Sequence, residues 1–214
     1  MAERLVQDYI LLIMNCERYR EKSKKQKETW IPLLPNTLKY YHVIGNPDLE
    51  TEFLFVESEN VLYVKTMDDY NSLPKKVIAS YNAVHKTFQY KYILKTDDDQ
   101  NVLNSKFFDM IMGMIPKKEP KVHYGGLIVD VKQPYYSQYH RIHPELPKEI
   151  PVLAIRYCNG RFYFLSREAV AFLLLKREQI GKEYLEDYAI GLNLIEHMKT
   201  NMLHIQSDLF FKDF

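Results

Sequence analysis

Short apolar runs bounded by polar residues recur along the chain and indicate buried β-strands. The first run, Tyr9 to Asn15, is rich in Ile and Leu and has the character of a strand buried on both faces of a parallel sheet. By the same criterion we predict further strands at Leu38 to Ile44, Phe53 to Val56, Val61 to Lys65, Tyr90 to Thr96, His123 to Val129, Phe162 to Leu165 and Met202 to Ile205.

Between these runs, apolar residues fall at helical spacing. The clearest helix follows Ser72, with Pro74 in its first turn and one apolar face formed by Val77, Tyr81, Val84 and Phe88. Further helices are predicted at Arg18 to Trp30, at Lys106 to Met114, after a capping Ser166, and at Tyr184 to Lys199. The Pro-rich segment Gln133 to Pro151 lacks periodicity and is predicted to be a long loop, of the kind that often serves as a lid or a binding loop.

The order strand, helix, strand with short connections implies right-handed parallel crossovers, and hence an α/β fold with a mostly parallel central sheet flanked by helices. With 214 residues, 46% of them hydrophobic, the chain is long enough to bury a sizeable core, and we expect one domain.

The net charge narrows the choice of partners. Lysine and arginine number 29 against 28 acids, so no overall field favours a nucleic-acid partner. The longest apolar run near the amino terminus, Tyr9 to Met14, is too short for a signal-peptide core or a membrane span. From this we expect a cytoplasmic chain without a membrane span.

Three consecutive carboxylates, Asp97, Asp98 and Asp99, follow the predicted strand Tyr90 to Thr96. Ligands of open α/β sheets bind at the carboxyl ends of the strands, and adjacent carboxylates there are suitable ligands for Mg²⁺ or Mn²⁺. The alternative is a solvated loop that caps the next helix. An EF-hand loop is excluded because Val102 and Phe108 occupy the positions of the required glycine and glutamate.

Two other sites carry candidate chemistry. In Leu185-Glu186-Asp187, the acids could complement the dipole of the helix that follows, or one carboxylate could act as a general base in the cleft. His204 lies in a short apolar segment, which is typical of a core histidine, but beside an acid-bound metal it could serve as an imidazole ligand.

Taken together, these segments resemble the β-1,3-galactosyltransferase and fringe-type glycosyltransferase family over roughly residues 9 to 205. The matching pieces occur in the family's order: Glu28-Thr29-Trp30, Asp69-Tyr70-Asn71-Ser72-Leu73, Lys95-Thr96-Asp97-Asp98-Asp99, Tyr157-Cys158-Asn159-Gly160 and Leu185-Glu186-Asp187-Tyr188-Ala189-Ile190-Gly191. The resemblance implies a single Rossmann-like GT-A domain over residues 1 to 214, with a nucleotide-sugar half at about 1 to 100 and an acceptor half at about 101 to 214. It also implies a hexosyltransferase that uses a UDP-sugar and Mn²⁺, or Mg²⁺, to glycosylate a hydroxyl group of a glycan or glycoprotein with inversion.

The resemblance also implies a role for each site residue. Asp99 would bind the metal directly, Asp97 and Asp98 would hold ribose, sugar hydroxyls or metal-bound water, and Asp97 and His204 could complete the metal shell. Asp187 would take the proton from the acceptor hydroxyl. Asn15 and Arg20, at and just after the end of the first strand, are candidates for binding the nucleotide.

The sequence departs from the family pattern at several positions. Gln100 and Asn101 replace an apolar continuation, Arg161 stands where glycine is usual, and Ala189 alters the segment after Asp187. The membrane anchor of the Golgi members is not present, so the chain resembles a compact microbial or large-virus member, or one domain of a longer protein.

Three alternative functions stay open at this point. One is a glycosyltransferase that retains configuration. The second is a phosphohydrolase of the haloacid dehalogenase type, with Asp97 as nucleophile and Asp99 as acid, although Asn101 fits that motif poorly. The third is a catalytically silent domain that binds a sugar nucleotide.

Overall fold

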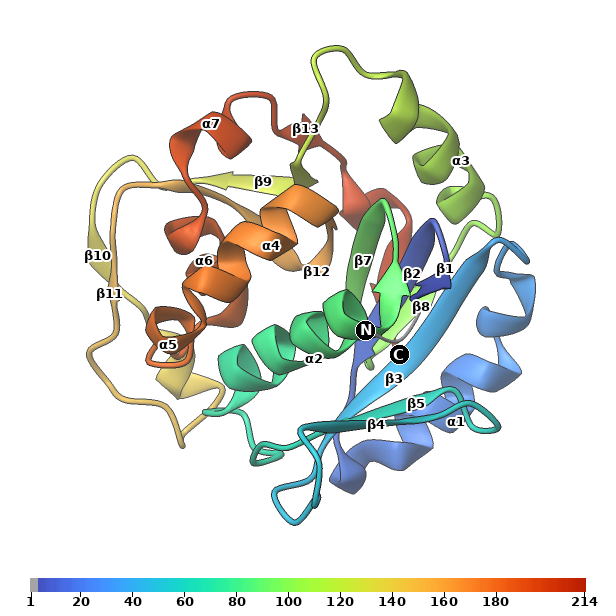
Figure 1. Ribbon diagram of the computed structural model, residues 1–214. Coiled ribbons are helices and arrows are strands. Elements are labelled where there is room, and N and C mark those ends of the chain that lie inside the picture. The colour runs from blue at the N-terminus through green and yellow to red at the C-terminus, as the bar shows by residue number, and fades with distance from the viewer. Residues whose placement is uncertain (1–3) are drawn as a thin grey trace.

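A mostly parallel sheet of eight strands, in the order β13-β9-β12-β7-β2-β3-β5-β4, forms the centre of the molecule (Figure 1). The structure is a computed structural model and describes residues 4–214. Within this sheet β12 is antiparallel to both of its neighbours and β4 is antiparallel to β5, whereas the other pairs are parallel. The predicted α/β fold class is confirmed.

The strands of the sheet are β2 (Tyr9–Met14), β3 (Leu38–Gly45), β4 (Phe53–Val56), β5 (Val61–Val64), β7 (Tyr92–Asp97), β9 (Tyr124–Asp130), β12 (Arg156–Ser166) and β13 (Leu203–His204). Three smaller pairings join β1 (Leu5–Val6) to β6 (Phe88–Gln89), β8 (Gln100–Val102) to β14 (Phe211–Asp213), and β10 (Tyr135–Tyr136) to β11 (Pro151–Val152). The helices are α1 (Arg20–Glu28), α2 (Leu73–Thr87), α3 (Phe107–Met114), α4 (Arg167–Leu175), α5 (Arg177–Ile180), α6 (Glu186–Asn193) and α7 (Glu196–Lys199).

The strand β2 shows why the sheet lies at the centre of the core. Successive side chains of a strand point to opposite faces, and all six residues of β2 are buried. Ile10, Leu12 and Met14 belong to a core cluster that includes residues of α2, α4 and α6. Tyr9, Leu11 and Ile13 belong to a second cluster, which includes residues of α3. The continuous apolar run in the sequence therefore reflects burial on both faces.

Each predicted helix forms, with differences in extent. Phe88, predicted on the apolar face of the helix after Ser72, lies beyond the end of α2, in β6. The side chain of Ser166 accepts a hydrogen bond from the backbone N–H of Ala169 at 3.2 Å, so Ser166 caps α4 as predicted. The predicted helix Tyr184 to Lys199 is instead two helices, α6 and α7, because Leu194 and Ile195 have extended backbone angles. The Asn193 side chain donates to the Ala189 carbonyl at 2.9 Å and so satisfies a backbone acceptor at the end of α6.

The strand β12 is longer than predicted. It begins at Arg156, and its register against β9 shifts between Cys158 and Tyr163. Such a bulge turns backbone groups away from the regular ladder, and bulges are common beside active sites. The backbone of Gly160 lies within this irregular stretch.

The carboxyl ends of β2, β3, β5 and β7 meet at one edge of the sheet, because these strands are parallel. The backbone N–H of Asp98 donates to the Met14 carbonyl at 3.0 Å, which joins the ends of β7 and β2. The acid triplet therefore lies at the edge where the sequence predicts it. Separately, no helix within residues 4–214 is both long and apolar enough to cross a membrane.

Candidate active site

Lys95, on β7, is a buried lysine beside the acid triplet. The residue is 1% exposed, and its Nζ donates to Oδ1 of Asp97 at 2.7 Å and to the carbonyl oxygen of Gly160 at 2.9 Å. The same Nζ lies 3.0 Å from Oε2 of Glu186. Burial by itself would lower the pKa of Lys95, but the carboxylates of Asp97 and Glu186 hold the pKa above its usual value. Lys95 is thus a charged lysine with three acceptors, which join β7, β12 and α6.

The three acids of the triplet have different partners. Asp97 is paired with Lys95, whereas Asp98 Oδ1 lies 3.1 Å from Lys22 Nζ on α1. Asp99 Oδ1 accepts a hydrogen bond from Gln100 Nε2 at 2.6 Å. Within residues 4–214, Asp99 is therefore the acid of the triplet that is paired with an amide and not with an ammonium group.

Asp187, in the first turn of α6, has its carboxylate fixed by the backbone. Its Oδ2 accepts from the N–H of Gly160 at 2.9 Å, and its Oδ1 accepts from the N–H of Tyr188 at 2.8 Å. Because Gly160 also accepts from Lys95, this glycine connects Asp187 to the Lys95–Asp97 pair. The structure thus brings together Asp97 and Asp187, which are 90 residues apart in the sequence.

The acids of the site share an electrostatic pattern. Burial raises the pKa of Asp97 to about 6, with Lys95 opposing the rise, and raises the pKa of Asp98 to about 6, with Lys22 opposing it. Burial also raises the pKa of Glu186 and of Asp187, and in both cases Lys95 acts in the opposite direction. Clusters of acids with perturbed pKa values are typical of functional sites, although ion-pair networks produce them as well.

Asn15 lies at the end of β2 and is brought next to the triplet. Its side chain is buried, its Oδ1 accepts from the N–H of Cys16 at 2.6 Å, and its Nδ2 has no hydrogen-bond partner in the part of the chain that the structure describes. The buried Lys76 donates to the Asn15 carbonyl at 2.6 Å and to Asp68 at 2.9 Å. Asn15 therefore combines a fixed backbone with an unused amide donor.

Two other predicted site residues, Arg20 and His204, make no hydrogen bond or ion pair with the acid triplet within the described part of the chain. Arg20, at the start of α1, pairs with Glu17 at 2.7 Å and donates to the hydroxyl of Tyr63 at 2.7 Å. His204 is exposed on β13, and β9 and β12 separate it from β7. At a spacing of about 4.8 Å between strands this amounts to roughly 14 Å across the sheet. The structure therefore does not bring His204 together with Asp99.

Among the residues that the structure describes, there is no preformed metal cage. Within residues 4–214, no three His, Cys, Asp or Glu side chains gather in a way that could hold a metal ion. Mg²⁺ and similar ions commonly take one or two protein carboxylates and obtain their other ligands from phosphate oxygens and water. The carboxylates of the triplet have the chemistry of such ligands, and Asp99 is the one whose side-chain partner is not an ammonium group.

Three aromatic rings stack beside the site. The ring of His143, in the long loop between β10 and β11, stacks on Tyr70 with centroids 3.8 Å apart and on Tyr139 with centroids 5.7 Å apart. The Asn71 side chain donates to the Glu145 carbonyl at 3.1 Å, which is a further link between this loop and the segment before α2. The loop predicted to be a lid or binding loop thus packs against the segment before α2, and the β10–β11 pair joins its two ends.

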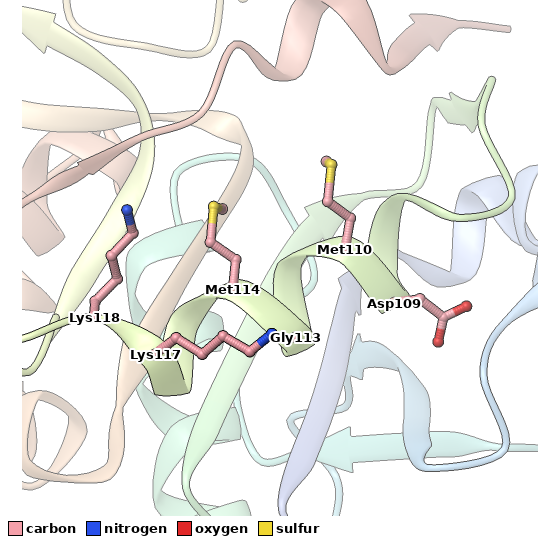
Figure 2. A pocket seen from close by; sticks show the side chains of 6 residues that line it. All are labelled: Asp109, Met110, Gly113, Met114, Lys117 and Lys118. Atoms are coloured by element: carbon pink, nitrogen blue, oxygen red, sulfur yellow. The ribbon is translucent and has the colours of Figure 1, made fainter.

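A separate hollow of about 520 Å³ lies on α3 (Figure 2). It is lined by Asp109, Met110, Gly113, Met114, Lys117 and Lys118. None of the predicted site residues lines it, and one carboxylate among methionines and lysines offers no acid pair for catalysis. This hollow is therefore distinct from the candidate site at the edge of the sheet.

Sequence reasoning missed Lys95, Glu186 and Gly160 as parts of the site. Lys95 had a visible signal, because a lysine inside an otherwise apolar strand is almost never buried without an anionic partner. Glu186 is buried and its Oε1 accepts from the hydroxyl of the buried Tyr163. No sequence pattern indicates this contact, because it depends on how α6 packs against β12.

Comparison with known proteins adds an independent observation. The family model for galactosyltransferases matches residues 20–206. No curated protein sequence matches the chain. A solved glycosyltransferase involved in the glycosylation of the major capsid of PBCV-1 is similar with a TM-score of 0.51 and 11% identity, over 94% of this chain and 83% of that one. The glycosyltransferase GlyE of Streptococcus pneumoniae TIGR4 has a TM-score of 0.50 and 9% identity, over 95% of this chain and 46% of its own. At such identities the two structures show a shared fold.

Proposed function

The chain belongs to the galactosyltransferase family, and from that premise we propose that it transfers a sugar from a UDP-sugar to a hydroxyl group of a glycan or glycoprotein. That the protein is a glycosyltransferase follows from the family match over residues 20–206 together with the glycosyltransferase fold of its structural neighbours. The donor, the acceptor, the stereochemistry and the metal are parts of the proposal. The family match also favours transfer over the phosphohydrolase alternative.

One observation carries the proposal: an acid cluster and a second, backbone-fixed carboxylate occupy the same edge of the sheet. Gly160 accepts from Lys95, which holds Asp97, and donates to Asp187. A transfer reaction needs a group that stabilises the departing phosphate and a base near the attacking hydroxyl. The triplet and Asp187 supply these two groups at one place.

Asp187 acts as the general base in this proposal. Both of its oxygens accept a backbone N–H, which holds the carboxylate in one orientation while its remaining lone pairs stay available. The acceptor oxygen forms a bond to the anomeric carbon as the bond from that carbon to the UDP oxygen breaks, and the acceptor proton passes to Asp187. This single displacement inverts the configuration and needs no covalent enzyme intermediate.

On the donor side, the triplet faces the diphosphate in this proposal. Asp99 would hold a divalent cation, Mn²⁺ or Mg²⁺, which when bound neutralises negative charge on the departing UDP. Asp97 and Asp98, already positioned by Lys95 and Lys22, would accept hydrogen bonds from ribose or sugar hydroxyls. The Nδ2 of Asn15 has no hydrogen-bond partner among the described residues but is buried, so in this proposal the Asn15 side chain turns to donate to an oxygen of the bound nucleotide.

The proposal is tested by incubating the protein with UDP-, GDP- and TDP-sugars, with and without Mn²⁺. A UDP-sugar that raises the melting temperature only when Mn²⁺ is present is the expected result, because a ligand of the folded state stabilises it. The identified donor is then offered to a panel of glycan acceptors, and the anomeric configuration of the product is determined by NMR. A product that keeps the donor's configuration contradicts the role given to Asp187, and release of phosphate without transfer contradicts the proposal as a whole.

A further inference from the structure

Three positions at which the sequence departs from the family pattern meet at one place in the structure. Gln100 and Asn101 lie in β8, which pairs with β14 in antiparallel register, so that Gln100 lies opposite Asp213. Arg161 lies in the irregular part of β12, and its guanidinium also reaches Asp213. These three residues therefore form one docking site for the segment that contains β14.

Gln100 connects this segment to the acid triplet. Its Nε2 donates to Oδ1 of Asp99 at 2.6 Å and to Oδ1 of Asp213 at 2.9 Å, so that both N–H groups of the amide are used on carboxylates. The Oε1 of Gln100 is buried and has no partner within the described part of the chain. The two carboxylates therefore fix the orientation of the Gln100 amide, with its nitrogen toward them and its carbonyl oxygen unpaired among the described residues.

Arg161 balances the charge of this bridge. Its Nη2 donates to Oδ1 of Asp213 at 3.0 Å, and its Nη1 donates to Oδ1 of Asp208 at 3.1 Å. Two carboxylates that share one amide repel each other, and the guanidinium on Asp213 offsets that repulsion. The side chains of Asp208 and Asp213 are 60% and 65% exposed, so neither ion pair contributes much to folding stability.

The backbone of the triplet is fixed by the same segment. The N–H of Phe214 donates to the carbonyl oxygen of Asp99 at 2.9 Å, directly beyond the β8–β14 pairing. With its backbone carbonyl and its Oδ1 both engaged, Asp99 has one carboxylate oxygen, Oδ2, that makes no hydrogen bond to residues 4–214. The result is a carboxylate with one oxygen anchored and one oxygen available.

We propose that Asp213, acting through Gln100, is a positioning residue that orients the Asp99 carboxylate toward the phosphates and cation of the donor. The inference rests on the proposed function of Asp99 and adds to it a residue outside the matched range 20–206. Groups that hydrogen-bond to metal-binding carboxylates set their orientation, and removing such a group typically weakens metal binding about 10- to 100-fold.

The test compares the two aspartates that share Arg161. Asp213→Ala removes the partner of Gln100, whereas Asp208→Ala removes the other carboxylate on Arg161 and leaves the Gln100 bridge intact. The affinity for Mn²⁺ in the presence of UDP is measured by isothermal titration calorimetry, and the melting temperature without ligand is recorded for each variant. We expect binding about tenfold weaker for Asp213→Ala, unchanged binding for Asp208→Ala and similar melting temperatures for both.

Two further variants separate positioning from charge and from folding. Asp213→Asn keeps a carbonyl oxygen that can accept from Gln100, so binding close to that of the parent is expected. Gln100→Met removes the bridge from the other side, and a loss of affinity similar to that of Asp213→Ala is expected. Parent-like binding by Asp213→Ala, or an equal loss in Asp208→Ala, overturns the inference. Failure of the parent protein itself to bind UDP with Mn²⁺ instead overturns the donor assignment and this inference with it.

Discussion

The Nζ of Lys95 lies 3.0 Å from Oε2 of Glu186, and both side chains are buried. The pair joins the end of β7, which carries the acid triplet, to the start of α6, which carries Asp187. Lys95 also holds Asp97, so one ammonium group serves two buried or half-buried carboxylates. The two halves of the proposed active site are therefore fixed to each other by one ion-pair network.

We expect Lys95→Met to lower the free energy of unfolding by about 3–5 kcal/mol, because the substitution leaves Glu186 buried without its cation. Urea titration followed by circular dichroism measures this change. Lys91→Met is the matched control, since Lys91 pairs with Asp8 at 2.6 Å but is 61% exposed, and its loss is expected to cost less than about 1 kcal/mol. A loss of similar size in both variants would contradict the structural role of Lys95.

Asp187→Asn tests the proposed base. The asparagine still offers one oxygen to a backbone N–H, so the start of α6 should keep its place and UDP binding should change little. Because the amide cannot take the acceptor proton, transfer is expected to fall by about two orders of magnitude or more. The rate of sugar transfer and the affinity for UDP are measured on the same preparation. Transfer at the parent rate would remove Asp187 from the reaction.

The predictability of the fold and of the site differed for physical reasons. The strand predicted from the apolar run at Tyr9 to Met14 is confirmed, because burial on both faces of a sheet requires apolar residues at every position. Asp97 and Asp187 could be named because acids directly after a strand or at a helix start are visible in the sequence. The predicted single helix Tyr184 to Lys199 was wrong, because the spacing of Ile190, Leu194 and Met198 does not reveal that the backbone becomes extended at Leu194.

Contacts between segments that are distant in the chain could not be predicted from the sequence. The Gly160 backbone meets Asp187 only because β12 is irregular between Cys158 and Tyr163, and an apolar pattern does not encode a bulge. His204 has the residue type of a metal ligand, but the order of strands in the sheet, which the sequence does not state, places it away from Asp99.

Asp99→Ala is expected to abolish the Mn²⁺-dependent part of UDP binding, because the triplet's other acids are already paired with Lys95 and Lys22. The shift in melting temperature on adding UDP with Mn²⁺ is the measurement. Asp109→Ala is the control, since this acid lies on α3 beside the separate hollow, and the parent shift is expected there (Figure 2). An undiminished shift in Asp99→Ala would show that the cation is held elsewhere.

Two helical glycines should respond in opposite directions to alanine. A Cβ on Gly191 in α6 would lie 2.2 Å from Cβ and 3.0 Å from Cα of Tyr157, so Gly191→Ala must push α6 away from β12 and is expected to lower both stability and transfer. Nothing lies within 4 Å of a Cβ on Gly113 in α3, and there the gain in helix propensity should stabilise the protein by about 0.5–1 kcal/mol. Thermal unfolding of both variants checks the signs.

His42 on β3 supplies a pH dependence of stability. The ring is buried, neither nitrogen has a hydrogen-bond partner among the described residues, and burial lowers the pKa of His42 to about 3. An unfolded chain has its histidine pKa near 6.5, so below pH 6.5 the unfolded state binds a proton that the folded state does not. The contribution of His42 is therefore complete above pH 6.5 and is lost progressively as the pH falls toward 3.

Between pH 7 and pH 5 this loss amounts to about 2 kcal/mol. The raised pKa values of Asp97 and Asp98 act in the opposite direction, because these folded-state carboxylates take up protons near pH 6, before the unfolded chain does. The pH dependence of the free energy of unfolding of the parent is thus a sum of these contributions. Comparison with His42→Leu isolates the contribution of the histidine. Measured by urea unfolding, the free energy of unfolding should fall by about 2 kcal/mol less in His42→Leu than in the parent between pH 7 and pH 5. Equal losses in His42→Leu and the parent would show that His42 is protonated in the folded protein.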